Sequence, residues 1–69
     1  MILQEYKEYT DTTNRFTLEI FTFETLTVVK LFNRGEEEFK MEYDTESPVV
    51  KGAITSLIKM MNNELYQHN

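Results

Sequence analysis

The chain has 69 residues, no cysteine, and twelve acidic against seven basic side chains, which gives a formal charge of −5. A chain of this length buries only about 60% of the surface that its unfolded form exposes, so it has room for one core and excludes a second domain. The basic residues stand singly along the chain, which excludes the cationic cluster that nucleic-acid binding requires.

The apolar runs are all shorter than the roughly 18 to 20 residues that a membrane-spanning helix needs. The N-terminus begins Met1-Ile2-Leu3 and becomes polar at Gln4, so it has neither the basic nor the apolar segment of a secretory signal. We therefore expect a soluble, cytoplasmic protein that consists of a single domain over residues 1–69.

The first segment, residues 1–9, is ambiguous. Ile2, Tyr6 and Tyr9 suit one face of a helix, whereas the Tyr and Thr content suits a strand, which we favour. Residues 10–14 then form the first loop. Residues 15–23 are rich in aromatic and branched side chains and predict a strand that turns at Glu24-Thr25.

The next two segments predict a hairpin. Residues 26–32 and 37–43 flank Asn33-Arg34-Gly35, and the glycine can take the positive φ that a short turn needs. Together with residues 15–23 they form a three-stranded antiparallel meander, or a four-stranded one if residues 1–9 are a strand.

Residues 48 to about 66 predict an amphipathic helix. Ser47 is its expected N-cap, Pro48 has its φ preset at the first helical position, and fraying is expected from Asn62 onward. The apolar residues fill an arc of roughly 180°, wider than the usual stripe of a surface helix. They are Val49, Val50, Ala53, Ile54, Leu57, Ile58, Met60, Met61 and Leu65. The fold class is therefore α+β, with this helix packed on one face of the sheet.

Because side chains alternate along a strand, the predicted sheet has more apolar surface than one helix can cover. In residues 37–43 the apolar side chains share one face, but residues 15–23 and 26–32 carry apolar side chains on both faces. One helix covers only one face, so either the N-terminal segment folds over the other face or a partner or second copy covers it. The candidate residues for self-association as a homodimer are Phe21, Phe23, Val29 and Ile58.

Residues 36–46 hold six acids and one lysine, which places a charge of −5 in the last strand and the approach to the helix. In an extended strand, alternate carboxylates lie about 6.6 to 6.8 Å apart on one face. Such a surface either imitates nucleic-acid phosphates and binds a cationic groove or is a solvated face, and the residues alone favour the solvated face. The candidate partner-binding residues are Glu36, Glu37, Glu38, Glu42, Asp44 and Glu46.

Catalytic chemistry is not indicated. The single histidine, His68, is one residue from the chain end, and Ser47 is better explained as a helix cap than as a nucleophile. One histidine without cysteine does not make a zinc site, and no phosphate-binding or dinucleotide motif is present. We expect no enzyme activity, no metal and no cofactor.

The pattern of residues 16 to 65 resembles the small acidic phage proteins that inhibit Cas9, the type II anti-CRISPR proteins. The likeness lies in the turn Asn33-Arg34-Gly35-Glu36-Glu37, the strand from Phe39 to Tyr43, and Asp44-Thr45-Glu46-Ser47 before the helix. Arg34 departs from the family pattern, which has an acid before the glycine.

The resemblance implies an inhibitor that works in a bacterial host cell as a DNA mimic. It also implies that Glu36, Glu37, Glu42 and Asp44 contact basic residues of Cas9 that normally receive the DNA duplex. The other hypothesis is a homodimeric structural or accessory protein that uses the spare apolar face, with the acids serving only solubility.

Overall fold

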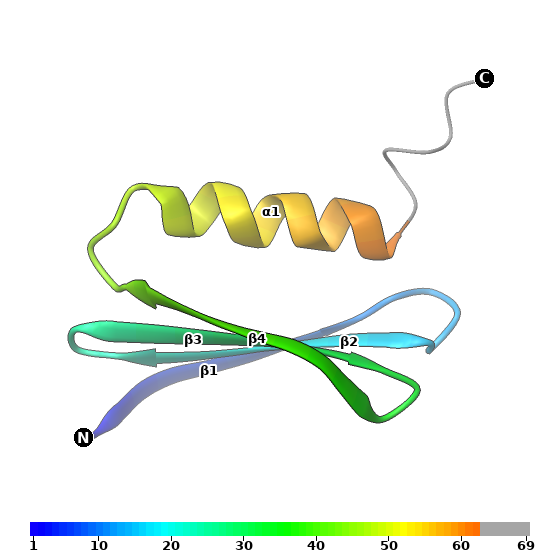
Figure 1. The fold of residues 1–69 in the computed structure, drawn as a ribbon, viewed down its shortest axis with the longest axis horizontal. Coiled ribbons are helices and arrows are strands. Elements are labelled where there is room, and N and C mark those ends of the chain that lie inside the picture. The colour runs from blue at the N-terminus through cyan, green and yellow to red at the C-terminus, as the bar shows by residue number, and fades with distance from the viewer. Residues whose placement is uncertain (63–69) are drawn as a thin grey trace.

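The computed structural model of the protein describes residues 1–62. It contains the strands β1 (Leu3–Thr10), β2 (Phe16–Phe23), β3 (Leu26–Asn33) and β4 (Glu36–Asp44), followed by the helix α1 (Val49–Met61). The strands form one antiparallel sheet in the order β1-β2-β3-β4 (Figure 1). The predicted α+β meander is confirmed, and the ambiguous first segment is its fourth strand.

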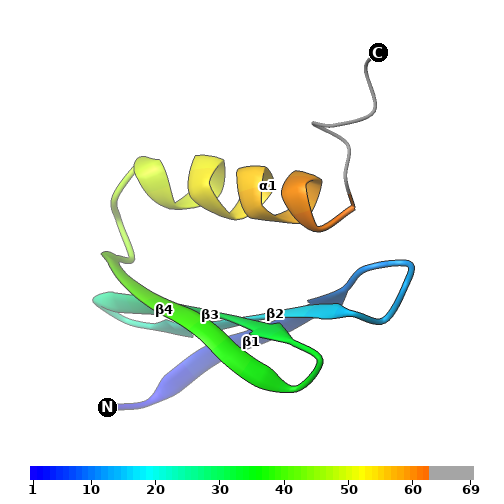
Figure 2. The ribbon, with the colours of Figure 1, turned by 45° about the vertical axis from the view of Figure 1, so that its right-hand side comes forward.

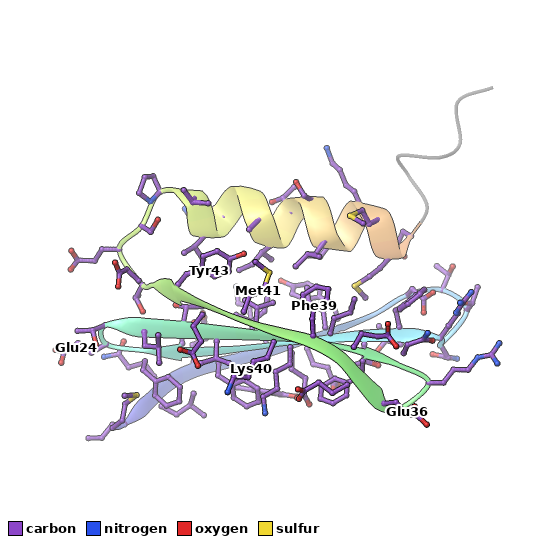
Figure 3. The ribbon with its side chains drawn as sticks, viewed as in Figure 1. Glu24, Glu36, Phe39, Lys40, Met41 and Tyr43 are labelled. Atoms are coloured by element: carbon purple, nitrogen blue, oxygen red, sulfur yellow. The ribbon has the colours of Figure 1, made fainter. Side chains whose placement is uncertain are left out.

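The helix lies along one face of the sheet, and none of the elements within residues 1–62 lies over the opposite face (Figure 2). We call that opposite surface the open face. The core between sheet and helix is built on Leu18, Ile20, Val29 and Met61. In β4 the side chains of Phe39, Met41 and Tyr43 point toward the helix and Lys40 points away (Figure 3), as the alternation predicted.

The turn between β3 and β4 has two central residues with positive φ, Arg34 at 53° and Gly35 at 86°. Two such residues make a type I′ turn, whose twist matches that of the flanking strands. Glycine adopts this conformation without strain, but arginine does so at a cost. The Arg34 backbone amide donates a hydrogen bond of 2.7 Å to the Arg15 carbonyl, which ties the turn to the start of β2.

α1 begins at Val49, one residue later than predicted, and Pro48 rather than Ser47 occupies its N-cap position. Pro48 already has helical dihedral angles, φ −67° and ψ −12°, and the Val49 amide donates to the Ser47 hydroxyl at 3.2 Å. The described helix ends at Met61, next to the point from which fraying was expected, and the Asn62 backbone N–H and side-chain amide both donate to the Ile58 carbonyl. The predicted continuation over residues 63–66, like His68, lies outside the described residues.

The loop between β1 and β2 is organised by Asp11, whose side chain is buried at 6% exposure. One carboxylate oxygen accepts hydrogen bonds from the backbone amides of Arg15 at 2.8 Å and Phe16 at 3.0 Å. The other accepts from the Thr13 hydroxyl at 2.6 Å. The Thr13 hydroxyl, and after it the Phe16 amide, hold the pKa of Asp11 below its ordinary value.

Replacement of Asp11 by alanine is expected to lower the melting temperature by several degrees at neutral pH. Because the folded-state pKa is depressed, the carboxylate stabilises the fold above its unfolded pKa of about 3.9 and loses this effect as pH falls through the folded value. The difference in melting temperature between wild type and Asp11→Ala, followed by circular dichroism, should therefore shrink in acid. Glu24→Ala, in the exposed β2–β3 turn, is the control, and an Asp11 difference independent of pH would contradict this role.

Candidate protein-interaction surfaces

The six acids predicted for partner binding are all exposed and lie along β4 and the connection that follows it. β4 is an edge strand of the sheet, so no other strand of the described part of the chain pairs with its outer side. Glu36 and Glu37 follow the β3–β4 turn, Glu42 and Asp44 lie on the open face opposite Val28 and Leu26, and Glu46 precedes the helix.

The predicted regular row of carboxylates is interrupted by an irregularity in β4. Leu31 pairs with Phe39, but its neighbour Phe32 pairs with Glu37, so Glu38 is an additional residue in the strand. A bulge of this kind shifts the side-chain alternation by one residue. Glu36, opposite Asn33, therefore belongs to the helix side of the sheet, whereas Glu37, opposite Phe32, lies on the same face as Glu42.

The fold adds a seventh acid that the sequence prediction missed. Glu24, in the β2–β3 turn, lines a surface hollow together with Asp44 and Glu46. The Thr45 amide donates to the Thr25 carbonyl at 3.0 Å, which holds the chain after β4 against this turn. Glu24 and Glu36 lie at opposite ends of the sheet, so acids gather at both ends of β4 (Figure 3).

We call this surface the acidic edge: Glu24, Glu36, Glu37, Glu38, Glu42, Asp44 and Glu46. Two cations belong to the same region: Lys40, whose ammonium lies 3.5 Å from the Glu42 carboxylate, and Arg34 in the turn. Seven acids against these two give −5, whereas the rest of residues 1–62 holds four acids and five bases, a sum of +1. Among the described residues, the negative charge is thus concentrated at one side of the fold.

The open face is apolar at its centre. The register places Tyr6, Phe21 and Val28 side by side on adjacent strands, with Phe23 beside Leu26. The Tyr6 and Phe21 rings pack with their centroids 5.1 Å apart, and the Lys30 ammonium lies 5.4 Å from the centroid of the Phe21 ring. The N-terminal segment does not cover this face, because it extends the sheet as β1.

Two of the four residues predicted for self-association do not lie on the open face. Val29 pairs with Ile20 and has 0% exposure beneath the helix, so the prediction that it contacts another subunit is wrong. Ile58 packs against the same core from α1. Phe21 and Phe23 lie on the open face, half-buried by their neighbours, and stay candidates.

Polar side chains form one row across the open face. Glu8, Glu19, Lys30 and Lys40 are register partners from β1 to β4. The Tyr6 hydroxyl donates to Glu19 at 2.9 Å and to Glu8 at 3.3 Å. Partial desolvation of the phenol, followed by the hydrogen bond to Glu19, raises the pKa of Tyr6 to about 12, so this hydroxyl keeps its proton and remains a donor.

Within residues 1–62, no group of three or more histidine, aspartate or glutamate side chains is arranged to hold a metal ion. The same part of the chain contains no helix of the length and apolarity needed to cross a membrane. Comparison of the sequence and structure with protein families, curated proteins and solved structures found no match. The two surfaces described above therefore carry the functional argument.

Proposed function

We propose that the protein is a small inhibitor, encoded by a phage, that binds the basic nucleic-acid-binding surface of a larger protein of the Cas9 class. The acidic edge is the binding surface, and the inhibitor acts in the bacterial cytoplasm without turnover or a cofactor. The observation that supports this proposal is the location of the negative charge, because an acid of the β2–β3 turn joins those of β4 at one exposed edge, which carries −5, while the rest of residues 1–62 carries +1.

The chemistry of the edge suits a cationic groove. Its carboxylates are exposed, so they lose little solvation before contact and can attract a positive surface over several ångströms. Charge complementarity of this kind accelerates association and selects the partner more than it raises affinity. A nucleic-acid strand carries a phosphate about every 3.4 Å, so an edge of seven carboxylates imitates only a short stretch of it.

The proposal predicts that Glu37→Gln/Glu42→Gln slows association with guide-loaded Cas9 by at least about tenfold at low salt. The matched control is Glu5→Lys, which makes the same change in net charge on the opposite edge strand, β1, and is expected to associate within about twofold of wild type. Surface plasmon resonance at about 50 mM and about 200 mM salt measures both rates, and higher salt should slow the wild type most.

Three results would contradict the proposal. If wild type does not bind Cas9, the assignment of the partner is wrong. If the double variant and the control slow association equally, net charge matters but the acidic edge does not. If neither variant slows association, the carboxylates of the acidic edge serve only solvation.

A further inference from the structure

The open face combines an apolar centre with one row of charged side chains whose sign changes across the sheet. Glu8 and Glu19 lie on β1 and β2, whereas Lys30 and Lys40 lie on β3 and β4, all in one register row. The next row is Tyr6, Phe21, Val28 and Glu42. Within the first row, two acids beside two bases form the pattern that a surface needs to be complementary to a copy of itself. Glu42 and Asp44 lie outside this row, at the β4 edge of the face.

We propose that the open face is a homodimer interface in which two copies pack face to face about a two-fold axis parallel to the strands. Such an axis, placed between β2 and β3, reverses the strand order. β1 then lies over β4 of the partner subunit, and β2 lies over β3 of the partner subunit. The two sheets pack about 10 Å apart at the small angle that their twist imposes.

This axis matches both charge and apolar surface. Glu19 faces Lys30 of the partner subunit, and Glu8 faces Lys40 of the partner subunit. In the apolar rows, Phe21 faces Val28 of the partner subunit and Phe23 faces Leu26 of the partner subunit. Each contact occurs twice, because a two-fold interface uses the same surface on both copies.

A two-fold axis across the strands does not fit. In that arrangement each strand lies over the same strand of the partner subunit, and the order of the rows along the strands is reversed. If this axis passes through the charged row, Glu19 faces Glu19 of the partner subunit and Lys30 faces Lys30 of the partner subunit. If it passes between the charged row and the row of Phe21, the Glu19 carboxylate is buried against the ring of Phe21 of the partner subunit. Both arrangements carry an electrostatic cost, because like charges repel and an unpaired charge loses its solvation. The charge pattern therefore selects the axis along the strands.

The area is consistent with a reversible dimer. Four strands about 4.8 Å apart and eight residues long at about 3.4 Å per residue give a plan area of roughly 500 Å² per subunit. Side-chain relief raises the accessible area above this value, toward the lower end of specific interfaces. We therefore expect a dissociation constant on the order of micromolar.

Single-stranded nucleic acid is a second class of ligand that stacks on aromatic side chains of an open sheet. It requires a positive groove, and Glu8, Glu19 and Glu42 share this face with the aromatic side chains. The charge therefore favours a second copy over nucleic acid. Binding of a labelled oligonucleotide that Phe21→Ala abolishes would overturn the dimer assignment.

Charge-swapped variants of the full chain test the proposal. Glu8→Lys/Glu19→Lys makes the charged row wholly basic, and Lys30→Glu/Lys40→Glu makes it wholly acidic. Each variant alone should dimerise at least about tenfold more weakly than wild type, and an equimolar mixture should recover a heterodimer. The control Glu5→Lys/Lys7→Glu changes the same strand on its other face and should dimerise as wild type.

Sedimentation velocity over a micromolar concentration series measures the association, and far-ultraviolet circular dichroism verifies that each variant is folded. A wild type that stays monomeric at high micromolar concentration overturns the proposal. So do folded variants that dimerise alone as strongly as wild type. This inference depends on the open face, so its failure leaves the binding proposed for the acidic edge untouched.

Cysteine cross-linking then tests the axis, and the absence of natural cysteine makes single substitutions unambiguous. A mixture of Glu8→Cys and Lys40→Cys chains should form a disulfide-linked dimer on mild oxidation, because these residues face each other. Glu8→Cys alone should cross-link at least about tenfold less, since its two copies then lie at opposite edges roughly 14 Å apart. Preferential cross-linking of Glu8→Cys to itself would overturn the axis along the strands.

Discussion

Leu18→Ala is expected to lower the free energy of unfolding by about 2–5 kcal/mol. Leu18 is at the centre of β2 with 0% exposure, between Tyr9 of β1 and Leu31 of β3 and within the core cluster beneath the helix. The substitution removes apolar contacts and leaves a cavity that the neighbouring strands can close only in part. A domain of this size has a total stability of only about 3–10 kcal/mol, so a large fraction of the variant should be unfolded at physiological temperature.

Urea denaturation followed by circular dichroism measures this loss. The matched control is Leu3→Ala, which removes the same atoms from a side chain that is 46% exposed on the edge strand β1. Surface substitutions of this kind usually change stability by less than about 0.5 kcal/mol. Equal losses in the two variants would mean that the core is not centred on Leu18.

The meander and its turns were predictable because they depend on local signals. The two-residue turns at Glu24-Thr25 and Arg34-Gly35 connect strands whose apolar residues alternate, and a turn of fixed length determines the register of its hairpin. Residues 1–9 were harder to assign because every residue of β1 is exposed. A strand without a buried face shows no alternation that distinguishes it from a helix.

The side of the sheet that the helix covers could not be predicted. β2 and β3 are apolar on both faces, so the pattern alone did not distinguish Val29, which is buried, from Phe21, which lies on the open face. The decision comes from β4, where only the face with Phe39 and Met41 is apolar, and from the tertiary packing of α1. Periodicity predicted the strands and which side chains share a face, but it did not show which face of β2 and β3 is the core.

The candidate acidic site was predicted in composition but not in shape. The bulge at Glu38 has no signal in the residues around it, and it changes the faces of the acids before it. The position of Glu24 near Asp44 could have been predicted from the sequence. Glu24 lies in the two-residue turn just before β3, and the β3–β4 hairpin pairs Leu26, at the start of β3, with Asp44, at the end of β4. Sequence reasoning that treated the acids as one continuous segment overlooked this contact.

The two proposed surfaces meet at Glu42. It belongs to the acidic edge, and it also occupies the row of the open face that contains Phe21. In the proposed dimer Glu42 faces Tyr6 of the partner subunit, whereas Glu24, Glu36 and Glu46 lie beyond the ends of the apolar rows. A larger partner that requires Glu42 would therefore compete with the second copy, and dimerisation would lower the concentration of free inhibitor.

Thr45→Val is expected to lower the free energy of unfolding by about 1–3 kcal/mol. The Thr45 hydroxyl donates to the Phe23 carbonyl at 2.8 Å, so the Thr27 hydroxyl, 3.0 Å away, is the donor to Thr45. Thr27 is 2% exposed, and valine at position 45 would leave its hydroxyl without this acceptor. The substitution conserves shape, so the loss reports the hydrogen bonds.

The same contacts position part of the acidic edge, because Thr45 lies between Asp44 and Glu46 and is tied to the turn that carries Glu24. Urea denaturation of Thr45→Val, Thr27→Val and the double variant should show a coupling energy of about 0.5–3 kcal/mol. Thr55→Val, on the exposed side of α1, is the control and should leave stability within about 0.5 kcal/mol. Additive effects at positions 27 and 45 would mean that the two hydroxyls act separately, and the Thr45 hydroxyl would then hold the acids around it through its bond to the Phe23 carbonyl and not through Thr27.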